Sequence, residues 1–147
     1  KMKKFLRVVL VCSMMVWSLG IPAGASGTAG TIVGLEDLPC EAVECQEQIV
    51  PLSVVSLDIE VFVGELVQAS SNFYLETGET VEINVTYSPK SASMDFGLIA
   101  PDGLFHYVNS KTGAIRKTIR VDEQGYYTFA IRNNSSDTVR VMGFVNY

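Results

Sequence analysis

Residues that carry nucleophilic or redox chemistry are scarce in this chain. Its 147 residues include three cysteines, one histidine and one tryptophan, and both Cys12 and Trp17 lie within the first 25 positions. Nucleophilic catalysis needs a histidine beside a serine or cysteine nucleophile. The single His106 lies between Phe105 and Tyr107 with no nucleophile-elbow motif nearby. We therefore expect a structural or merely exposed histidine and no catalysis of this type.

Clusters of basic residues are also missing. The chain has 11 Lys and Arg against 16 Asp and Glu, and four of the basic residues precede position 8. All the acidic residues come after position 25, so residues 26–147 carry a net charge of −9. Nucleic acids and anionic lipids are bound by basic surfaces. The charge therefore disfavours both kinds of partner.

Long apolar segments are limited to one, near the start. Four basic residues within the first seven positions precede an uncharged apolar segment at 8–19, and small residues dominate 20–25. This order is typical of a secretory signal peptide, and about 12 apolar residues are too few to cross a membrane as a helix. The sequence predicts a cleaved signal peptide at 1–25 and a secreted, extracellular mature protein.

Residues 26–51 show neither a strand nor a helix period and are rich in Gly, Ala, Glu and Pro. We expect an extended, acidic arm that is dispensable for folding. The arm includes Cys40 and Cys45, which an exported protein would join in a short-range disulfide. Free or intermolecular thiols are the first alternative. A metal site is the second, although two thiols alone are too few ligands.

From residue 52 onward, apolar and polar residues alternate with period two, which indicates strands with one buried face. Gly, Pro, Asn and Asp separate eight such segments at spacings near ten residues. The expected strands are 56–68, 73–75, 81–87, 94–100, 104–109, 115–121, 127–131 and 138–147. The sequence thus predicts an all-β domain at 52–147, an antiparallel, jelly-roll-like β-sandwich of about seven or eight strands.

Two segments carry a family resemblance. Residues 96–103 read Phe-Gly-Leu-Ile-Ala-Pro-Asp-Gly, and residues 121–133 read Val-Asp-Glu-Gln-Gly-Tyr-Tyr-Thr-Phe-Ala-Ile-Arg-Asn. A strand ending in Pro-Asp-Gly, followed by one opening with Gly-x-Tyr and ending near Asn, is similar to bacterial prepeptidase C-terminal domains and Golgi-dynamics domains. The resemblance implies a small sandwich with an accessory role in a secreted protein. The whole chain also resembles small exported proteins of Gram-positive bacteria.

The Gly-Tyr-Tyr segment makes a specific structural prediction. Tyr127 shares its parity with Phe129 and Ile131, so its ring should be buried and its hydroxyl bonded to a backbone group at the strand corner. Tyr126 has the opposite parity and should be more exposed. Gly125 would allow the tight turn that precedes the pair.

The other aromatic residues divide by the same parity. Tyr87 and Phe96 fall in register with aliphatic neighbours and are expected in the core. The candidates for the opposite face, and hence for a binding surface, are Phe62, Tyr74, Phe105, Tyr107 and Tyr126. If they cluster, they form an apolar patch suited to a protein or polysaccharide partner; otherwise they are ordinary residual apolar surface.

Carboxylates provide the remaining candidates. Four of them lie at expected strand ends and would suit a calcium ion if they converged, although turn residues of this kind are commonly just solvated: Asp95, Asp102, Asp122 and Glu123. Asn84, Asn133 and Asn134 begin glycosylation sequons.

The expected function is a noncatalytic, secreted interaction or accessory module that binds a protein or polysaccharide. One alternative is a small extracellular hydrolase that uses surface carboxylates, and another is a calcium-stabilised carbohydrate-binding module. No other cofactor is expected.

Overall fold

A computed structural model describes residues 31–43, 49–50 and 55–147. Within them the chain forms twelve strands and one short 3-10 helix, η1 (Leu35–Asp37). The strands are β1 (Thr31–Gly34), β2 (Cys40–Ala42), β3 (Ile49–Val50), β4 (Val55–Val61), β5 (Leu66–Ala69), β6 (Phe73–Leu75), β7 (Thr80–Ser88), β8 (Met94–Ile99), β9 (Leu104–Ser110), β10 (Ala114–Arg120), β11 (Gly125–Asn133) and β12 (Val139–Asn146). The expected signal peptide at 1–25 lies outside the described residues.

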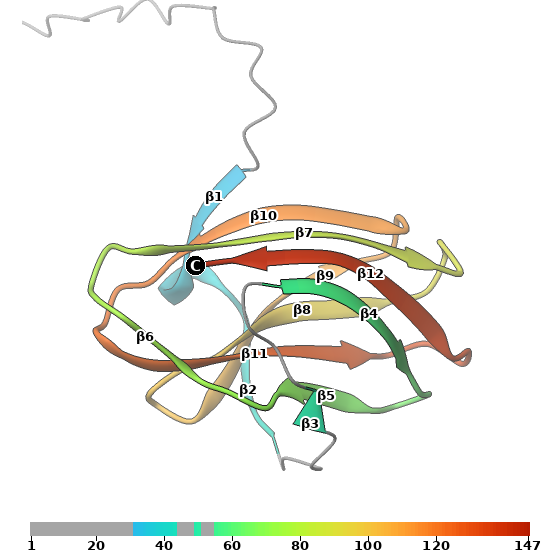
Figure 1. The fold of residues 1–147 in the computed structure, drawn as a ribbon, viewed down its shortest axis with the longest axis horizontal. Coiled ribbons are helices and arrows are strands. Elements are labelled where there is room, and N and C mark those ends of the chain that lie inside the picture. The colour runs from blue at the N-terminus through green and yellow to red at the C-terminus, as the bar shows by residue number, and fades with distance from the viewer. Residues whose placement is uncertain (1–30, 44–48, 51–54) are drawn as a thin grey trace, which may run out of the picture.

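The strands form two sheets that run along the long axis of the molecule (Figure 1). Sheet A has five strands in the order β1-β10-β7-β12-β4. Sheet B has seven, in the order β2-β9-β8-β11-β5-β3, with β6 also paired to β11. Most pairs are antiparallel, but β1 pairs with β10 and β3 pairs with β5 in parallel. The prediction of an all-β, antiparallel sandwich is confirmed.

Alternation explains how the core forms between the sheets. In β7 the residues Val81, Ile83, Val85 and Tyr87 are buried, and each intervening residue is exposed or half-buried. Because successive side chains point to opposite faces of a strand, one strand contributes one row to the core. Rows from both sheets form one continuous cluster of buried apolar side chains.

The segment expected as one strand at 56–68 is two strands in different sheets. A turn at 62–65 separates β4 in sheet A from β5 in sheet B, and Gly64 adopts a φ of 72° there. That conformation costs glycine little but strains other residues. Phe62 and Glu65 close the turn through a backbone hydrogen bond of 3.1 Å. Val63, which has the same parity as the buried Leu57 and Val61, is consequently exposed.

The expectation of an extended arm at 26–51 is corrected for residues 31–43. Residues 31–43 belong to the sandwich, because β1 extends the edge of sheet A and β2 extends the edge of sheet B. Leu35 in η1 is 3% exposed and belongs to the main core. These strands have three or four residues and pair with β9 and β10, which lie far along the chain. Their own alternation is too short to indicate a strand.

Candidate binding surface

The outer face of sheet B, which points away from the core, brings together two of the five candidate aromatic residues. Tyr74 of β6 and Tyr126 of β11 are directly paired across the two strands. Their ring centroids lie 5.3 Å apart in an edge-to-face arrangement with an interplanar angle of 72°. Both rings are solvent-accessible, with 49% of Tyr74 and 62% of Tyr126 exposed. We call Tyr74 and Tyr126 the tyrosine pair.

The expectation that Phe105 is a surface residue is wrong. Its ring is fully buried in a small second cluster on the outer face of sheet B, with Leu66, Ala130 and Val43. The parity argument placed Phe105 on the correct side of β9, away from the main core. The burial arises because β2 pairs beside β9 and Val43 packs onto this face.

Tyr107 is half-buried and stacks on Phe105 at a centroid distance of 5.3 Å. The Arg132 guanidinium lies over both rings, 4.8 Å from the Tyr107 centroid and 5.6 Å from that of Phe105. The fifth candidate, Phe62, lies in the turn between β4 and β5, near the opposite end of β11 from Tyr126. The structure therefore does not unite the five aromatic residues in one patch.

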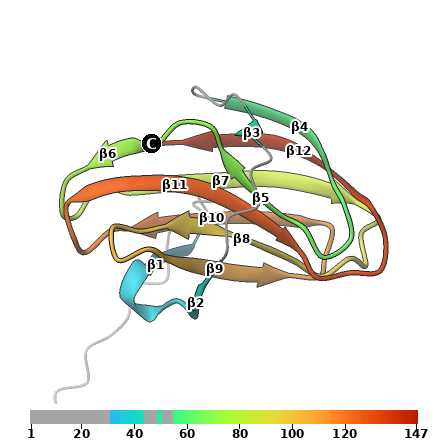
Figure 2. The same ribbon diagram turned by 90° about the horizontal axis from the view of Figure 1, so that it is seen from below.

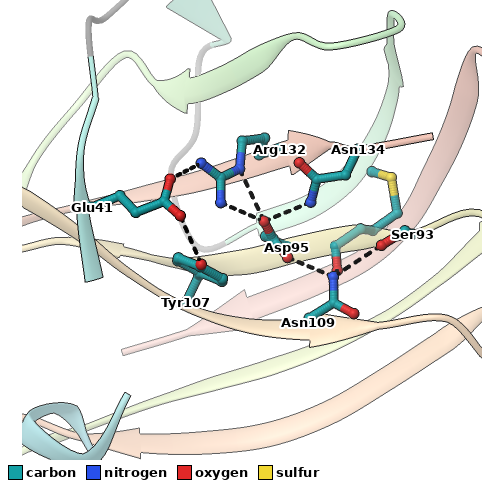
Figure 3. Close-up of polar contacts among 8 residues, drawn as sticks. Glu41, Ser93, Asp95, Tyr107, Asn109, Arg132 and Asn134 are labelled. Carbon is teal, nitrogen blue, oxygen red and sulfur yellow. Dashed lines mark hydrogen bonds and ion pairs between the residues drawn. The ribbon is translucent and has the colours of Figure 1, made fainter. Parts of the chain in front are cut away.

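A polar network occupies the same face of sheet B beside these rings (Figure 3). Arg132 of β11 donates to Asp95 of β8 through Nε at 2.9 Å and through a terminal nitrogen at 2.7 Å. Its other terminal nitrogen donates to Glu41 of β2 at 2.6 Å, and the Tyr107 hydroxyl donates to the same carboxylate at 3.0 Å. We call Glu41, Asp95, Tyr107 and Arg132 the arginine network.

Asp95 is the buried centre of this network, with its side chain 2% exposed. Besides the Arg132 bonds, it accepts from the side-chain amides of Asn109 at 2.7 Å and Asn134 at 2.6 Å. A buried carboxylate is tolerated only when charge and hydrogen bonds compensate for its lost hydration. Asp95 satisfies that condition, so it holds β8, β11 and the segment after β11 together.

The network also shifts the pKa values of Arg132 and Glu41. Burial would lower the pKa of Arg132, but the hydrogen bonds with Glu41 and Asp95 outweigh it and raise that pKa above its ordinary value. The hydrogen bond from Arg132, followed by that from Tyr107, lowers the pKa of Glu41. Arg132 and Glu41 are therefore both charged at neutral pH, and their pair fastens β2 to the outer face of sheet B.

The predicted tyrosine corner is confirmed. Tyr127 is fully buried, and its hydroxyl donates to the Glu123 carbonyl at 2.6 Å. Gly125 lies against the ring of Pro101, which leaves no room for a side chain at that position. The Pro-Asp-Gly turn before β9 and the Gly-Tyr-Tyr segment of β11 are therefore in contact at one end of the sandwich.

The corner gives Tyr127 an unusual ionisation. Burial, followed by the negative charges of Asp122 and Glu123, raises its pKa to about 12. The pKa of an unfolded tyrosine is near 10, so the folded state holds the Tyr127 proton more tightly than the unfolded state does. This difference adds to the free energy of unfolding fully below pH 10, and the contribution is lost progressively as the pH rises to about 12. We expect a loss of ~2–3 kcal/mol across that interval, measured by chemical denaturation at a series of pH values.

The control for this titration is Tyr127→Phe, which cannot ionise at that position. Its stability should fall less steeply between pH 10 and 12 than that of the parent protein. Tyrosinate absorbance should also show an ionisation near pH 12 in the parent protein that Tyr127→Phe lacks. Identical slopes for the two proteins would contradict the assignment.

The four calcium candidates do not converge. Asp95 belongs to the arginine network, whereas Asp102, Asp122 and Glu123 lie at the two turns near the tyrosine corner. Asp102 accepts from the Leu104 backbone at 2.8 Å and contacts His106 Nε2 at 2.9 Å. Across residues 31–43, 49–50 and 55–147, no group of three or more His, Cys, Asp and Glu side chains is arranged to hold a metal ion.

His106 and Cys40 are neighbours in register on β9 and β2. His106 is 8% exposed, and its Nδ1 is buried without a hydrogen-bond partner in the described part of the chain. Cys40 is exposed and carries a free thiol, and its expected disulfide partner, Cys45, lies outside the described residues. His106 is therefore a buried residue, and Cys40 is the one cysteine among the described residues.

Two of the three sequons begin with asparagines that the fold already uses. The Asn133 amide is buried and donates to the backbone carbonyls of Val61 and Asp137, and the Asn134 amide donates to Asp95. A glycan on either nitrogen would disrupt those bonds. Asn84 is half-buried on the outer face of sheet A.

Sequence reasoning missed Arg132, Glu41 and Asn109. Parity does place Arg132 on the outer face, opposite Phe129 and Ile131, and a basic residue directly after an apolar stretch is a usable signal. Nothing local indicates that its partners lie on β8 and β2.

No helix in the described part of the chain is long and apolar enough to cross a membrane. Comparisons with protein-family models, with curated proteins and with solved structures found no match for this chain.

Proposed function

We propose that this protein is a noncatalytic, exported binding module whose tyrosine pair contacts a polysaccharide. The observation that carries the proposal is the exposure of two in-register rings, 49% for Tyr74 and 62% for Tyr126, on the outer face of sheet B. Sugar rings present apolar C–H faces that pack on aromatic rings, while their hydroxyls bond to polar groups such as tyrosine hydroxyls. The pair offers both kinds of contact side by side.

The surroundings of the pair support this proposal. Tyr126 follows Gly125, which packs on Pro101, so the ring is attached to a corner with little freedom. Tyr126 is next to Tyr127 in sequence, and the latter is anchored by its bond to Glu123. Prior ordering of a contact residue lowers the entropy that binding costs. The apolar leader at 8–19 supports export, and the resemblance to prepeptidase C-terminal domains supports an accessory role.

A noncatalytic role is favoured by how the buried polar groups are used. Asp95 is saturated by Arg132, Asn109 and Asn134, and His106 contacts Asp102 in a turn. A general acid or base needs a proton that can reach a substrate. Asp95 and His106 instead make hydrogen bonds within the fold, so binding of a ligand is better supported than catalysis.

The test is cosedimentation of the protein with insoluble polysaccharides, cell-wall glycans first. Tyr126→Ala should weaken binding by about tenfold, the loss of one aromatic contact of ~1–1.5 kcal/mol. Phe144→Ala is the matched control, because Phe144 is a 43% exposed aromatic residue on the outer face of the opposite sheet.

Binding that is equally strong in Tyr126→Ala and in the parent protein would contradict the proposed contact. The supernatants should be assayed for soluble fragments of the glycan. Fragments that disappear when one carboxylate is replaced would favour the hydrolase instead.

A further inference from the structure

One edge of the sandwich is open beside an apolar groove. In the described part of the chain, β4 pairs with β12 on one side and with no strand on the other. Figure 2 shows β4 at the upper margin of the molecule. β4 has seven residues, whereas the other edge strands, β1, β2 and β3, have four, three and two. An open edge strand presents backbone N–H and C=O groups to which another strand can pair.

The groove lies between the sheets directly beside this edge. Its lining is almost entirely apolar: Leu57, Ile59, Val67, Gln68, Ala69, Phe129 and Ile131. Ile59 and Gln68 are half-buried, and the other lining residues are buried. A strand added to β4 would place every second side chain over this groove, because side chains alternate between the faces of a sheet. Apolar residues suit those positions.

Apolar surface continues past the end of β4. Phe62 and Val63, in the turn after β4, are 53% and 56% exposed. The turn is held by two bonds between Phe62 and Glu65, a backbone bond of 3.1 Å and a side-chain bond of 3.0 Å. Large exposed apolar residues on a hydrogen-bonded turn are typical of a contact surface.

Charge selects the occupant of this edge. The outward residues of β4 are Ser56, Asp58 and Glu60, and all are exposed. Arg140 pairs with Asp58 at 2.8 Å, so one negative charge of this row remains in excess. A second copy aligned antiparallel on β4 would oppose acidic residues with acidic residues, which destabilises strand pairing. A basic strand would gain cross-strand attraction instead.

We propose that β4 binds an extended segment of another protein in which apolar residues alternate with Lys or Arg. The segment adds a strand to sheet A, its apolar side chains cover the groove, and its basic side chains face Asp58 and Glu60. This inference is independent of the tyrosine pair, which lies on the outer face of the other sheet.

The probe is an acetylated heptapeptide, Lys-Val-Lys-Val-Lys-Val-Lys, titrated into the full chain by calorimetry. Two comparison peptides replace Lys by Glu, or keep the composition but group the three valines together. The alternating basic peptide should bind at least about fivefold more tightly than either, given three cross-strand contacts. Hydrogen exchange should slow at amides of β4 when the peptide is bound.

Glu60→Lys should reverse the preference between the basic and acidic peptides. The matched control is Glu123→Lys, the same change of charge at an exposed turn outside sheet A. Equal binding of the alternating and grouped peptides would overturn strand addition, because simple charge attraction does not depend on alternation. Protection at β1 or β2 in place of β4 would overturn the assigned edge. Dimerisation through β4 without peptide would show that a second copy is the occupant.

Discussion

The Tyr127→Ala variant should unfold with a free energy about 3 to 5 kcal/mol lower than that of the parent protein, the usual cost of removing a large aromatic core side chain. Tyr127 is fully buried between the sheets, and its hydroxyl bond to Glu123 at 2.6 Å closes the corner before β11. The substitution would leave a cavity at the place where two turns meet. Chemical denaturation monitored by circular dichroism measures the difference.

Two controls separate burial from hydrogen bonding in this prediction. Tyr127→Phe keeps the ring and loses the hydroxyl, so it should cost about 1 kcal/mol. Tyr126→Ala removes an identical side chain that is 62% exposed, and it should cost well under 1 kcal/mol. A larger loss at Tyr126 than at Tyr127 would mean that β11 faces the other way, and the tyrosine pair would then be wrongly assigned.

Local alternation was sufficient to predict the long strands. In β7 and β12 the period of two persists over nine and eight residues, and in β11 it relates Tyr127, Phe129 and Ile131, so the buried face can be read directly from the sequence. Tyr127 and Tyr126 were placed correctly for this reason. Parity along one strand is a local property and does not depend on which strands are neighbours.

The predictions that failed concern features that depend on segments distant in the sequence. β1 and β2 are strands because β10 and β9 offer them edges, and Phe105 is buried because Val43 packs onto it from a segment about sixty residues earlier. The partners of Arg132 are fixed by the order of strands in sheet B. Alternation shows that a side chain points outward, but it does not show what lies next to it.

The arginine network should contribute to the stability of the fold, because two of its members are largely buried. Asp95 is 2% exposed and Arg132 is 18% exposed, whereas the partners in the other Arg–Asp pair, Arg140 and Asp58, are 56% and 59% exposed. Removing one member of a buried pair leaves an uncompensated charge in a poorly hydrated site, whereas water replaces a lost partner at the surface. The two pairs have similar hydrogen bonds, so they form a natural comparison.

We therefore expect Arg132→Met to lower the free energy of unfolding by about 3 to 5 kcal/mol and the matched control Arg140→Met by at most about 1 kcal/mol. Thermal and chemical denaturation at neutral pH measure both. The double variant Arg132→Met, Asp95→Leu also removes the carboxylate that Arg132→Met leaves without its cationic partner. It should therefore be more stable than Arg132→Met alone, even though it loses the bonds from Asn109 and Asn134. A double variant less stable than Arg132→Met would show that the hydrogen bonds from Asn109 and Asn134 to Asp95 stabilise the fold by more than the unpaired carboxylate destabilises it, and that Asp95 is not the group that makes Arg132 necessary.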